Sequence, residues 1–310
     1  MKDLPTLLDE YLATRRALGA ALVDAEHMLR SFLAFLRQHA AVRITTQLAL
    51  QWATEPSQAQ PAWHARRLGT VRAFARYASA EDPRHEVPPE GLLTARHRRA
   101  TPYIYSAKEV ADLIAAAQRL RGSTGLRACT YSTLLALLAV TGMRSSEPLR
   151  LDRDDVDLVG GVLTVRHAKC GKSRCLPVHE STRQALADYA LQRDRLCPHP
   201  LDPAFFLSER GTRIVQNTLQ QTFVRLSRQV GLRERSDSRG PRLHDLRHRF
   251  AIETLLRWHR EGLDVEQRTP RLATYLGHVH VSDTYWYLSA TPELLQVAAR
   301  RLDRTARRPA

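Results

Sequence analysis

Six side chains in the C-terminal part of this sequence combine a nucleophile, cations and proton carriers. A tyrosine phenol can attack phosphorus and keep the bond energy in a covalent intermediate. Two guanidinium groups can stabilise the charge on the non-bridging oxygens. A lysine ammonium can protonate a leaving oxygen, which arginine cannot do at neutral pH, and two histidines can share the proton handling. The candidates are Arg144, Lys169, His244, Arg247, His278 and Tyr287.

The choice of lysine is informative because the chain uses arginine for almost every other cation. Among 47 basic residues only Lys2, Lys108, Lys169 and Lys172 are lysine. Two of them fall in one short predicted hairpin. This pattern favours a chemical need for an amine in the hairpin, with Lys172 as the rival of Lys169.

The order of these segments resembles the catalytic domain of the tyrosine recombinases, the phage integrase family. Thr141 to Arg144 with Glu147 match its threonine-glycine-hydrophobic-arginine motif and following glutamate. His244 to His248 match its histidine-aspartate-leucine-arginine-histidine motif, and Leu276 to His278 its leucine-glycine-histidine motif. The family places its nucleophile nine residues after that histidine, at Tyr287. The resemblance runs from residue 106 to about 302 and extends more loosely to the N-terminal helices.

The resemblance also ranks the rival side chains. Its lysine-x-glycine-lysine pattern favours Lys169 over Lys172 as the general acid. Tyr285, two residues before Tyr287, would face elsewhere on a helix. His248 is interpreted as a structural residue or one that supports the catalytic groups. Glu147 is interpreted as a positioning residue for Arg144 or its neighbours.

Two metal sites are weaker alternatives. An acidic run after the first motif could bind Mg²⁺, although the family has an acidic turn here, which favours a solvated loop; the run holds Asp152, Asp154, Asp155 and Asp157. A second group has spacing similar to zinc ligands, but alternate hairpin residues face opposite sides; it holds His167, Cys170, Cys175 and His179. We expect neither a metal nor another cofactor.

The elements that position these residues are mainly helical. Apolar residues recur at helical spacing through the first eighty residues, so residues 1–82 are predicted as an N-terminal helical domain. The resemblance implies that this is the family's core-DNA-binding domain. Residues 83–103 are proline-rich and basic and are predicted as a linker. Residues 104–310 are predicted as the integrase-type catalytic domain.

The catalytic domain is expected to be helical around one hairpin. Ser106 and Glu109 form a capping-box pair at the start of a helix. The apolar run 134–140 predicts a buried central helix that ends at Thr141 and Gly142. Residues 162–166 and 174–178 are strand-like and joined around Gly171, and further helices are predicted around 219–230 and 246–255. The expected fold is mainly α with a small antiparallel β-sheet, arranged as a two-domain clamp on duplex DNA.

Composition agrees with a DNA partner. The formal net charge of +15 favours a polyanion through phosphate neutralisation. The longest apolar stretch is too short to cross a bilayer, and four scattered cysteines do not suggest a disulfide framework. We therefore expect a cytoplasmic protein without a membrane partner.

The resemblance implies site-specific recombination through a 3′-phosphotyrosyl intermediate, with four identical protomers on two inverted-repeat DNA sites. A predicted tail helix would dock on a neighbouring protomer; its apolar residues are Leu294, Leu295, Val297, Ala298 and Leu302. Partner recombinases, the target sequence, and the choice between integration, transposition and dimer resolution stay open, with a mobile element preferred. The alternatives are a type IB-like topoisomerase and a DNA-binding protein of the same fold.

Overall fold

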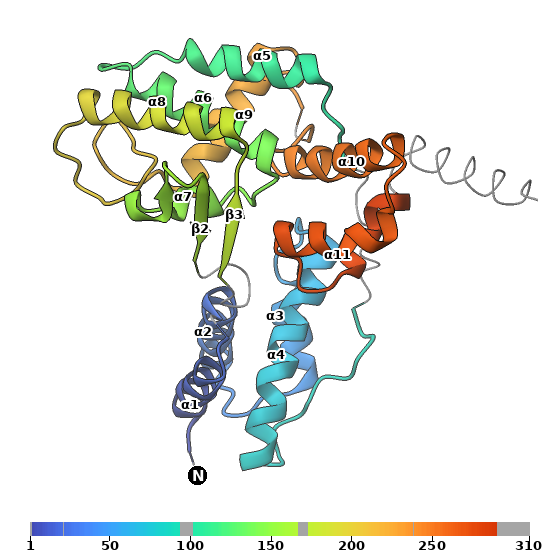
Figure 1. The fold of residues 1–310 in the computed structure, drawn as a ribbon. Coiled ribbons are helices and arrows are strands. Elements are labelled where there is room, and N and C mark those ends of the chain that lie inside the picture. Colours follow the sequence, from blue (N-terminus) through green and yellow to red (C-terminus); the bar gives the residue numbers. More distant parts are fainter. Residues whose placement is uncertain (1, 21, 94–101, 167–172, 238, 290–310) are drawn as a thin grey trace, which may run out of the picture. The chain divides into compact units, whose positions relative to one another are not determined.

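The computed structural model describes residues 2–20, 22–93, 102–166, 173–237 and 239–289. The chain divides into two compact units, Met1–Ala100 and Thr101–Ala310 (Figure 1). Each unit has its own hydrophobic core. No helix within the described ranges is long and apolar enough to span a membrane.

The first unit consists of helices, as its periodicity predicts. They are α1 (Leu4–Ala17), α2 (Val23–Gln38), α3 (Thr46–Thr54) and α4 (Pro61–Glu81). Asp3 and Thr45 cap α1 and α3 by accepting a backbone N–H in the first turn. The large aromatic side chains Phe32, Trp52 and Phe74 are fully buried between the helices.

The proline-rich segment after α4 packs on the first unit as far as it is described. The guanidinium of Arg72 donates to the carbonyl oxygens of Pro88 and Pro89, both at 2.7 Å. Val87 and Leu93 pack against the core of this unit. These contacts hold residues up to 93 on the first unit; the basic run 96–99 lies outside the described residues.

The second unit is built around α6 (Leu126–Thr141), which is almost wholly buried. The capping box of Ser106 and Glu109 starts α5 (Ala107–Gln118), as predicted. Val140 departs from the prediction of a helix buried on all sides, because half of its surface is exposed. The other elements are α7 (Glu147–Arg150), η1 (Arg153–Asp155), α8 (Glu180–Leu196), α9 (Gln216–Gln229), α10 (Asp245–Arg260), α11 (Val265–Leu276), α12 (Ser282–Tyr285) and η3 (Trp286–Ser289).

One small antiparallel sheet accompanies these helices. Its strands β1 (Val156–Asp157), β2 (Val162–Val165) and β3 (Arg174–Pro177) lie in that order. Leu163 pairs with Leu176, and both side chains enter the main core. The predicted hairpin is therefore confirmed, although β1 was not anticipated and Gly171 at the expected turn lies outside the described residues. The mainly α fold with a small antiparallel sheet is confirmed.

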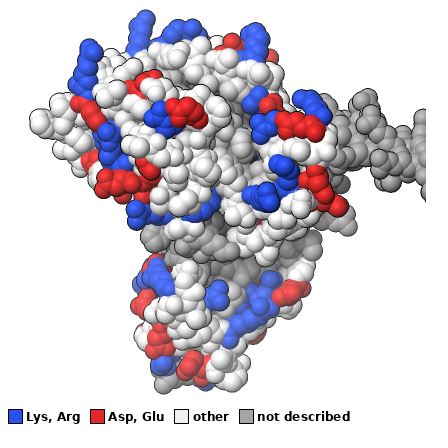
Figure 2. Space-filling view, in the orientation of Figure 1, with Lys and Arg blue, Asp and Glu red and all other residues white. Residues whose placement is uncertain are grey.

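Charge is mixed on the visible face of the molecule. Figure 2 shows acidic side chains interspersed with basic ones on this face. Ion pairs occur among the described surface residues, such as Arg153 with Asp194 at 3.0 Å. The net charge of +15 is therefore not concentrated in one unbroken basic patch on that face.

The glycine that ends α6 is required by its conformation and its surroundings. Gly142 has a φ of +61°, in the left-handed region that favours glycine. A Cβ there would lie 2.5 Å from Cδ1 of Phe250 and 3.1 Å from Cδ2 of Leu276. This close approach lets α10 and α11 pack against the end of α6.

We predict that Gly142→Ala destabilises the second unit by more than about 1 kcal/mol, because it adds a steric clash to the backbone strain. Gly231→Ala is the matched control: Gly231 has a φ of +76° but nothing within 4 Å of the added Cβ. Gly231→Ala should therefore lose only the stability that the backbone strain costs. Thermal or denaturant unfolding measures both, and equal losses would contradict the packing argument.

Candidate active site

The C-terminal end of α11 binds three guanidinium groups. Arg144 Nη2 donates to Gly277 O at 2.6 Å, and Arg247 Nη2 donates to Leu276 O at 2.8 Å. Arg174 Nε donates to Tyr275 O at 2.9 Å. The last carbonyls of a helix lack partners within the helix and carry partial negative charge. They therefore gather cations supplied by distant parts of the chain.

Glycine at the end of α11 makes this approach possible. Gly277 has a φ of +72° and caps the helix. A Cβ at this position would lie 2.7 Å from Arg174 Nη1 and 3.3 Å from Arg144 Nη1. The glycine of the leucine-glycine-histidine motif thus makes room for the arginines.

Arg247 links the remaining motifs. Its Nη1 donates to Gly142 O at 2.8 Å, so the guanidinium joins the end of α6 to the end of α11. Only 2% of this residue is exposed. Burial, with a smaller contribution from Arg144, lowers the pKa of Arg247 to about 10. The side chain is still a cation at neutral pH.

Glu147 is the carboxylate shared by two of these arginines. Oε2 accepts from the backbone N–H of Arg144 at 2.8 Å and from Arg174 Nη2 at 2.8 Å. Oε1 accepts from Arg144 Nη1 at 2.9 Å and Arg174 Nη1 at 3.0 Å. Burial opposes its ionisation, but the hydrogen bonds from Arg174 and the charge of both arginines outweigh it, so the pKa of Glu147 is lowered. These contacts suit the positioning role expected of Glu147.

The sequence analysis did not identify Arg174 as a site residue. The residue opens β3, and only 11% of its side chain is exposed. The available signal was an arginine at the start of the predicted strand 174–178, two residues after Lys172. Its partners lie 27 and 101 residues away along the chain, so local pattern could not show the role.

Tyr287 lies in the wall of this site rather than on the surface. It is 2% exposed, whereas its rival Tyr285 is 42% exposed. Its Oη lies 3.1 Å from Nδ1 of His248. The ring of His278 stacks on it, with centroids 6.1 Å apart and 21° between planes. Nδ1 of His278 lies 2.6 Å from Oγ1 of Thr284.

Two neighbouring histidines, His244 and His248, have lowered pKa values that favour the neutral ring. His244 precedes α10 and meets the ring of His248 edge to face at 4.9 Å. Although the residue as a whole is exposed, surrounding protein desolvates the ring, and Arg247 adds a repulsive charge. Together these effects lower the pKa of His244 to about 4. Burial, then the charge of His244, lowers the pKa of His248 to about 4.

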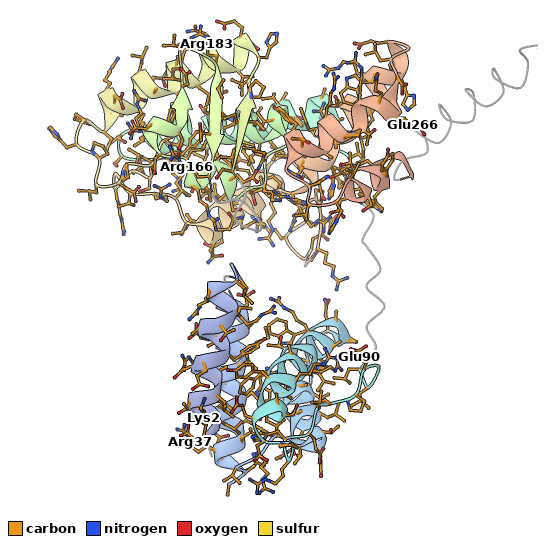
Figure 3. All side chains as sticks on the ribbon, turned by 60° about the horizontal axis from the view of Figure 1, so that its bottom comes forward. Lys2, Arg37, Glu90, Arg166, Arg183 and Glu266 are labelled. Carbon is orange, nitrogen blue, oxygen red and sulfur yellow. The ribbon has the colours of Figure 1, made fainter. Side chains whose placement is uncertain are left out.

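The proposed general acid, Lys169, lies outside the described residues, as does Lys172. The strands that flank them are described, and Val165 pairs with Arg174 at the base of the loop. Because Arg174 binds Glu147 and Tyr275, the base of the hairpin is attached to the arginine site. Arg166, which directly follows β2 and is labelled in Figure 3, donates to Asp155.

Three of the four aspartates in the acidic run after the first motif make structural contacts. Asp155 is 3% exposed and ion-paired with Arg166, which corrects the expectation of a solvated loop for this residue. Asp157 accepts the backbone N–H groups of Val159 and Gly160. Asp152 pairs with Arg213. Within the described ranges no group of three or more histidine, cysteine, aspartate or glutamate residues could hold a metal.

The second metal alternative is only partly described. His167 and Cys170 lie outside the described residues. Cys175 is exposed on β3, and His179 caps α8 by accepting from the backbone N–H of Ser181 at 3.3 Å. The cap gives His179 a structural role of its own.

The described geometry shows a mainly helical protein with three arginines gathered at the end of α11 and a buried tyrosine in the same unit. The phage integrase family model matches residues 104–293, and this chain belongs to that family. A relative from Sinorhizobium fredii, named "Putative integrase/recombinase y4rB", is 48% identical over 98% of both chains. A tyrosine recombinase XerC from Herpetosiphon aurantiacus is 29% identical over 79% of this chain and 73% of its own length. The Tn1549 transposon integrase, solved with transposon right-end DNA, shares the fold at a TM-score of 0.67 and 16% identity, covering 97% of this chain and 99% of that one.

The ion-pair cluster predicts a pH dependence of stability. The pKa of Glu147 is lower when folded than its usual 4.5, so its stabilisation is complete above that pH and is lost as the pH falls through the folded value. Glu147→Gln should cost about 3–5 kcal/mol at neutral pH, because it leaves buried arginines without their anion. Its stability should then fall less steeply than wild type below about pH 4.5.

Denaturant unfolding across acidic pH measures this difference. His244 and His248 also titrate on acidification, but they are common to both proteins, so the wild-type-minus-variant difference isolates Glu147. Glu180→Gln removes the exposed pair with Arg183 and should change little. Parallel pH curves for wild type and Glu147→Gln would contradict the assigned role.

Proposed function

We propose that this chain is a DNA strand transferase that performs site-specific recombination by cleavage and rejoining through a 3′-phosphotyrosyl intermediate. The observation that carries the proposal is the binding of Arg144 and Arg247 at the ends of α6 and α11. Tyr287 is buried in the cluster formed with α10 and α11 and is close enough to Arg247 to affect its pKa. The full-length similarity to an integrase/recombinase supports it. The catalytic residues would be Arg144, Lys169, His244, Arg247, His278 and Tyr287.

The two arginines would stabilise the phosphate. Each guanidinium has five N–H donors, and the bonds from Nη1 and Nη2 to protein atoms use two of them within the described part of the chain. These bonds fix the orientation of the fork, and the other donors remain for the non-bridging oxygens. A preorganised pair of cations stabilises the charge that develops in the transition state. This supplies the role that a metal ion has in other phosphoryl-transfer sites.

Strand cleavage follows from the remaining groups. The phenolic oxygen of Tyr287 attacks phosphorus, and the bond from phosphorus to the 5′-oxygen breaks. Lys169 gives a proton to the departing oxygen, because an ammonium can act as an acid where a guanidinium cannot. His244 and His278 hydrogen-bond the phosphate and share proton handling. Reversal with a different 5′-hydroxyl joins the exchanged strands.

The partners would be double-stranded DNA with inverted-repeat sites and three further copies of this chain. One fold neighbour is a lambda integrase tetramer bound to a Holliday junction, with a TM-score of 0.60. Residues 1–82 would bind the core DNA, and residues 83–103 would link this domain to the catalytic domain of residues 104–310. The tail after Pro292 would dock on the next protomer. A mobile-element role in a cytoplasmic setting is the proposed context, with partner recombinases as an option. Resolution of a Holliday junction by the purified protein distinguishes this from a type IB-like topoisomerase.

The nucleophile is tested with a nicked suicide substrate that traps the covalent adduct. We predict that Tyr287→Phe binds DNA like wild type but forms no adduct, because only the phenolic oxygen is lost. Tyr285→Phe is the matched control and should form the adduct normally. A denaturing gel reports the result, and adduct loss in Tyr285→Phe instead would reverse the assignment.

The general acid is tested by changing the leaving group. Lys169→Ala should slow cleavage of ordinary DNA by about 10²–10⁴-fold, and a 5′-bridging sulfur, which needs no proton, should largely remove that deficit. Arg144→Ala should stay defective on the sulfur substrate, since its charge acts on the non-bridging oxygens. Lys172→Ala should be affected far less on ordinary DNA. If sulfur rescued Lys172→Ala but not Lys169→Ala, Lys172 and not Lys169 would be the general acid. If sulfur rescued neither variant, the proposal that a lysine protonates the leaving oxygen would be refuted.

A further inference from the structure

His248 is a titratable group that the described contacts place against the phenolic oxygen of Tyr287. Its Nδ1 lies 3.1 Å from Oη of Tyr287, and the two rings are 5.5 Å apart. The residue sits in the first turn of α10, directly after Arg247. Only 15% of its side chain is exposed. The sequence analysis assigned His248 a structural or supporting role. Its contact with Oη of Tyr287 points instead to a role in the reaction itself.

The surroundings of His248 select one tautomer. In the resting pair, Nδ1 can accept the phenolic hydrogen only if the ring hydrogen is on Nε2. Nε2 lies 4.0 Å from Oδ1 of Asp245, a residue that is 1% exposed. Asp245 is held in place by Arg242, whose backbone N–H donates at 2.8 Å and whose Nη2 donates at 2.7 Å. A buried carboxylate near Nε2 favours a hydrogen on that nitrogen and stabilises a positive ring.

We propose that His248 is a further catalytic residue, which accepts the proton of Tyr287 as the phenol attacks the phosphodiester. The proposal rests on the proposed recombinase function and adds to it the base that activates the nucleophile. Asp245 is then a positioning residue, acting on the reaction through His248.

The step balances in atoms and charge. The O–H bond of Tyr287 breaks, its proton passes to Nδ1 of His248, and the oxygen electron pair forms the bond to phosphorus. The bond between phosphorus and the 5′-oxygen breaks, and that oxygen takes a proton from the general acid. The imidazolium of His248 lies beside the carboxylate of Asp245, and rejoining returns its proton to Tyr287.

The charges around His248 favour the accepting form before DNA binds. On and before α10 it faces His244, Asp245, Arg242 and Arg247, and on η3 it faces Tyr287 beside Trp286. Burial and these cations keep the pKa of His248 low, so the ring is neutral at physiological pH. A bound phosphodiester adds negative charge and raises that pKa, which makes the ring a better base when substrate is present.

Single-turnover adduct formation on the nicked suicide substrate tests the proposal in the full-length protein. His248→Ala removes the base and should slow the adduct by about 10²–10⁴-fold. Imidazole added to the buffer should restore much of that rate, because it can enter the vacated space and take the proton. His248→Asn keeps a hydrogen-bonding group near the Nδ1 position but cannot carry the proton, so it should stay slow.

Two controls separate the possible failures. His280→Asn changes an exposed histidine of the same unit and should react like wild type. Arg144→Ala should not respond to imidazole, and unfolding curves check that each variant is folded. DNA binding by His248→Ala should equal that of wild type.

The outcomes are distinct. Slow His248 variants with imidazole rescue support the proton-accepting role. A fast His248→Asn with a slow His248→Ala would overturn it, since the residue would then only orient the phenol. Normal rates in both variants, or slow folded variants without rescue, would also overturn it. If wild type forms no Tyr287-dependent adduct at all, the recombinase function itself fails.

Discussion

The arrangement of the site depends on the bonds between guanidinium groups and the last carbonyls of α11. Three arginines would repel one another if they met in a dry space, and among the described residues Glu147 supplies a formal negative charge that touches two of them. The partial negative charge at the C-terminal end of α11 offsets part of the remaining positive charge. Positive charge is therefore held in excess at a buried place. A phosphodiester group would complete its neutralisation, which is the physical reason to read this point as an anion site.

The same bonds connect motifs that are far apart along the chain. Arg144 reaches Gly277 across 133 residues, and Arg247 reaches Gly142 across 105. Each glycine ends a helix in a left-handed conformation and leaves a carbonyl exposed to an arginine of another motif. The site thus forms only when α6, α10 and α11 have packed together. Loss of one cap should therefore affect stability and chemistry together.

The proposed nucleophile, Tyr287, lies beside a neutral histidine, so electrostatic stabilisation and proton transfer would fall to different side chains. Arg144 and Arg247 are tied to the backbone and remain charged, which suits electrostatic stabilisation. His248 is buried and neutral, which suits proton transfer with Tyr287. The ring of His278 stacks on the ring of Tyr287. The first turn of α10 carries Arg247 and His248 in succession, so a cationic side chain and a proton-accepting ring are neighbours.

Local patterns in the sequence determined the elements and the candidate residues. Helical periodicity and the capping box at Ser106 predicted the helices and the hairpin, because each depends on residues a few positions apart. The candidate set around Tyr287 came from the order of the motifs along the chain, through the family resemblance. The burial of Asp155, the role of Arg174 and the contact between His248 and Tyr287 could not be predicted. Their partners lie 11, 101 and 39 residues away. Only the packing of α10 and α11 against the end of α6 and the hairpin brings such residues together, because spacing along a chain says nothing about which helix ends meet.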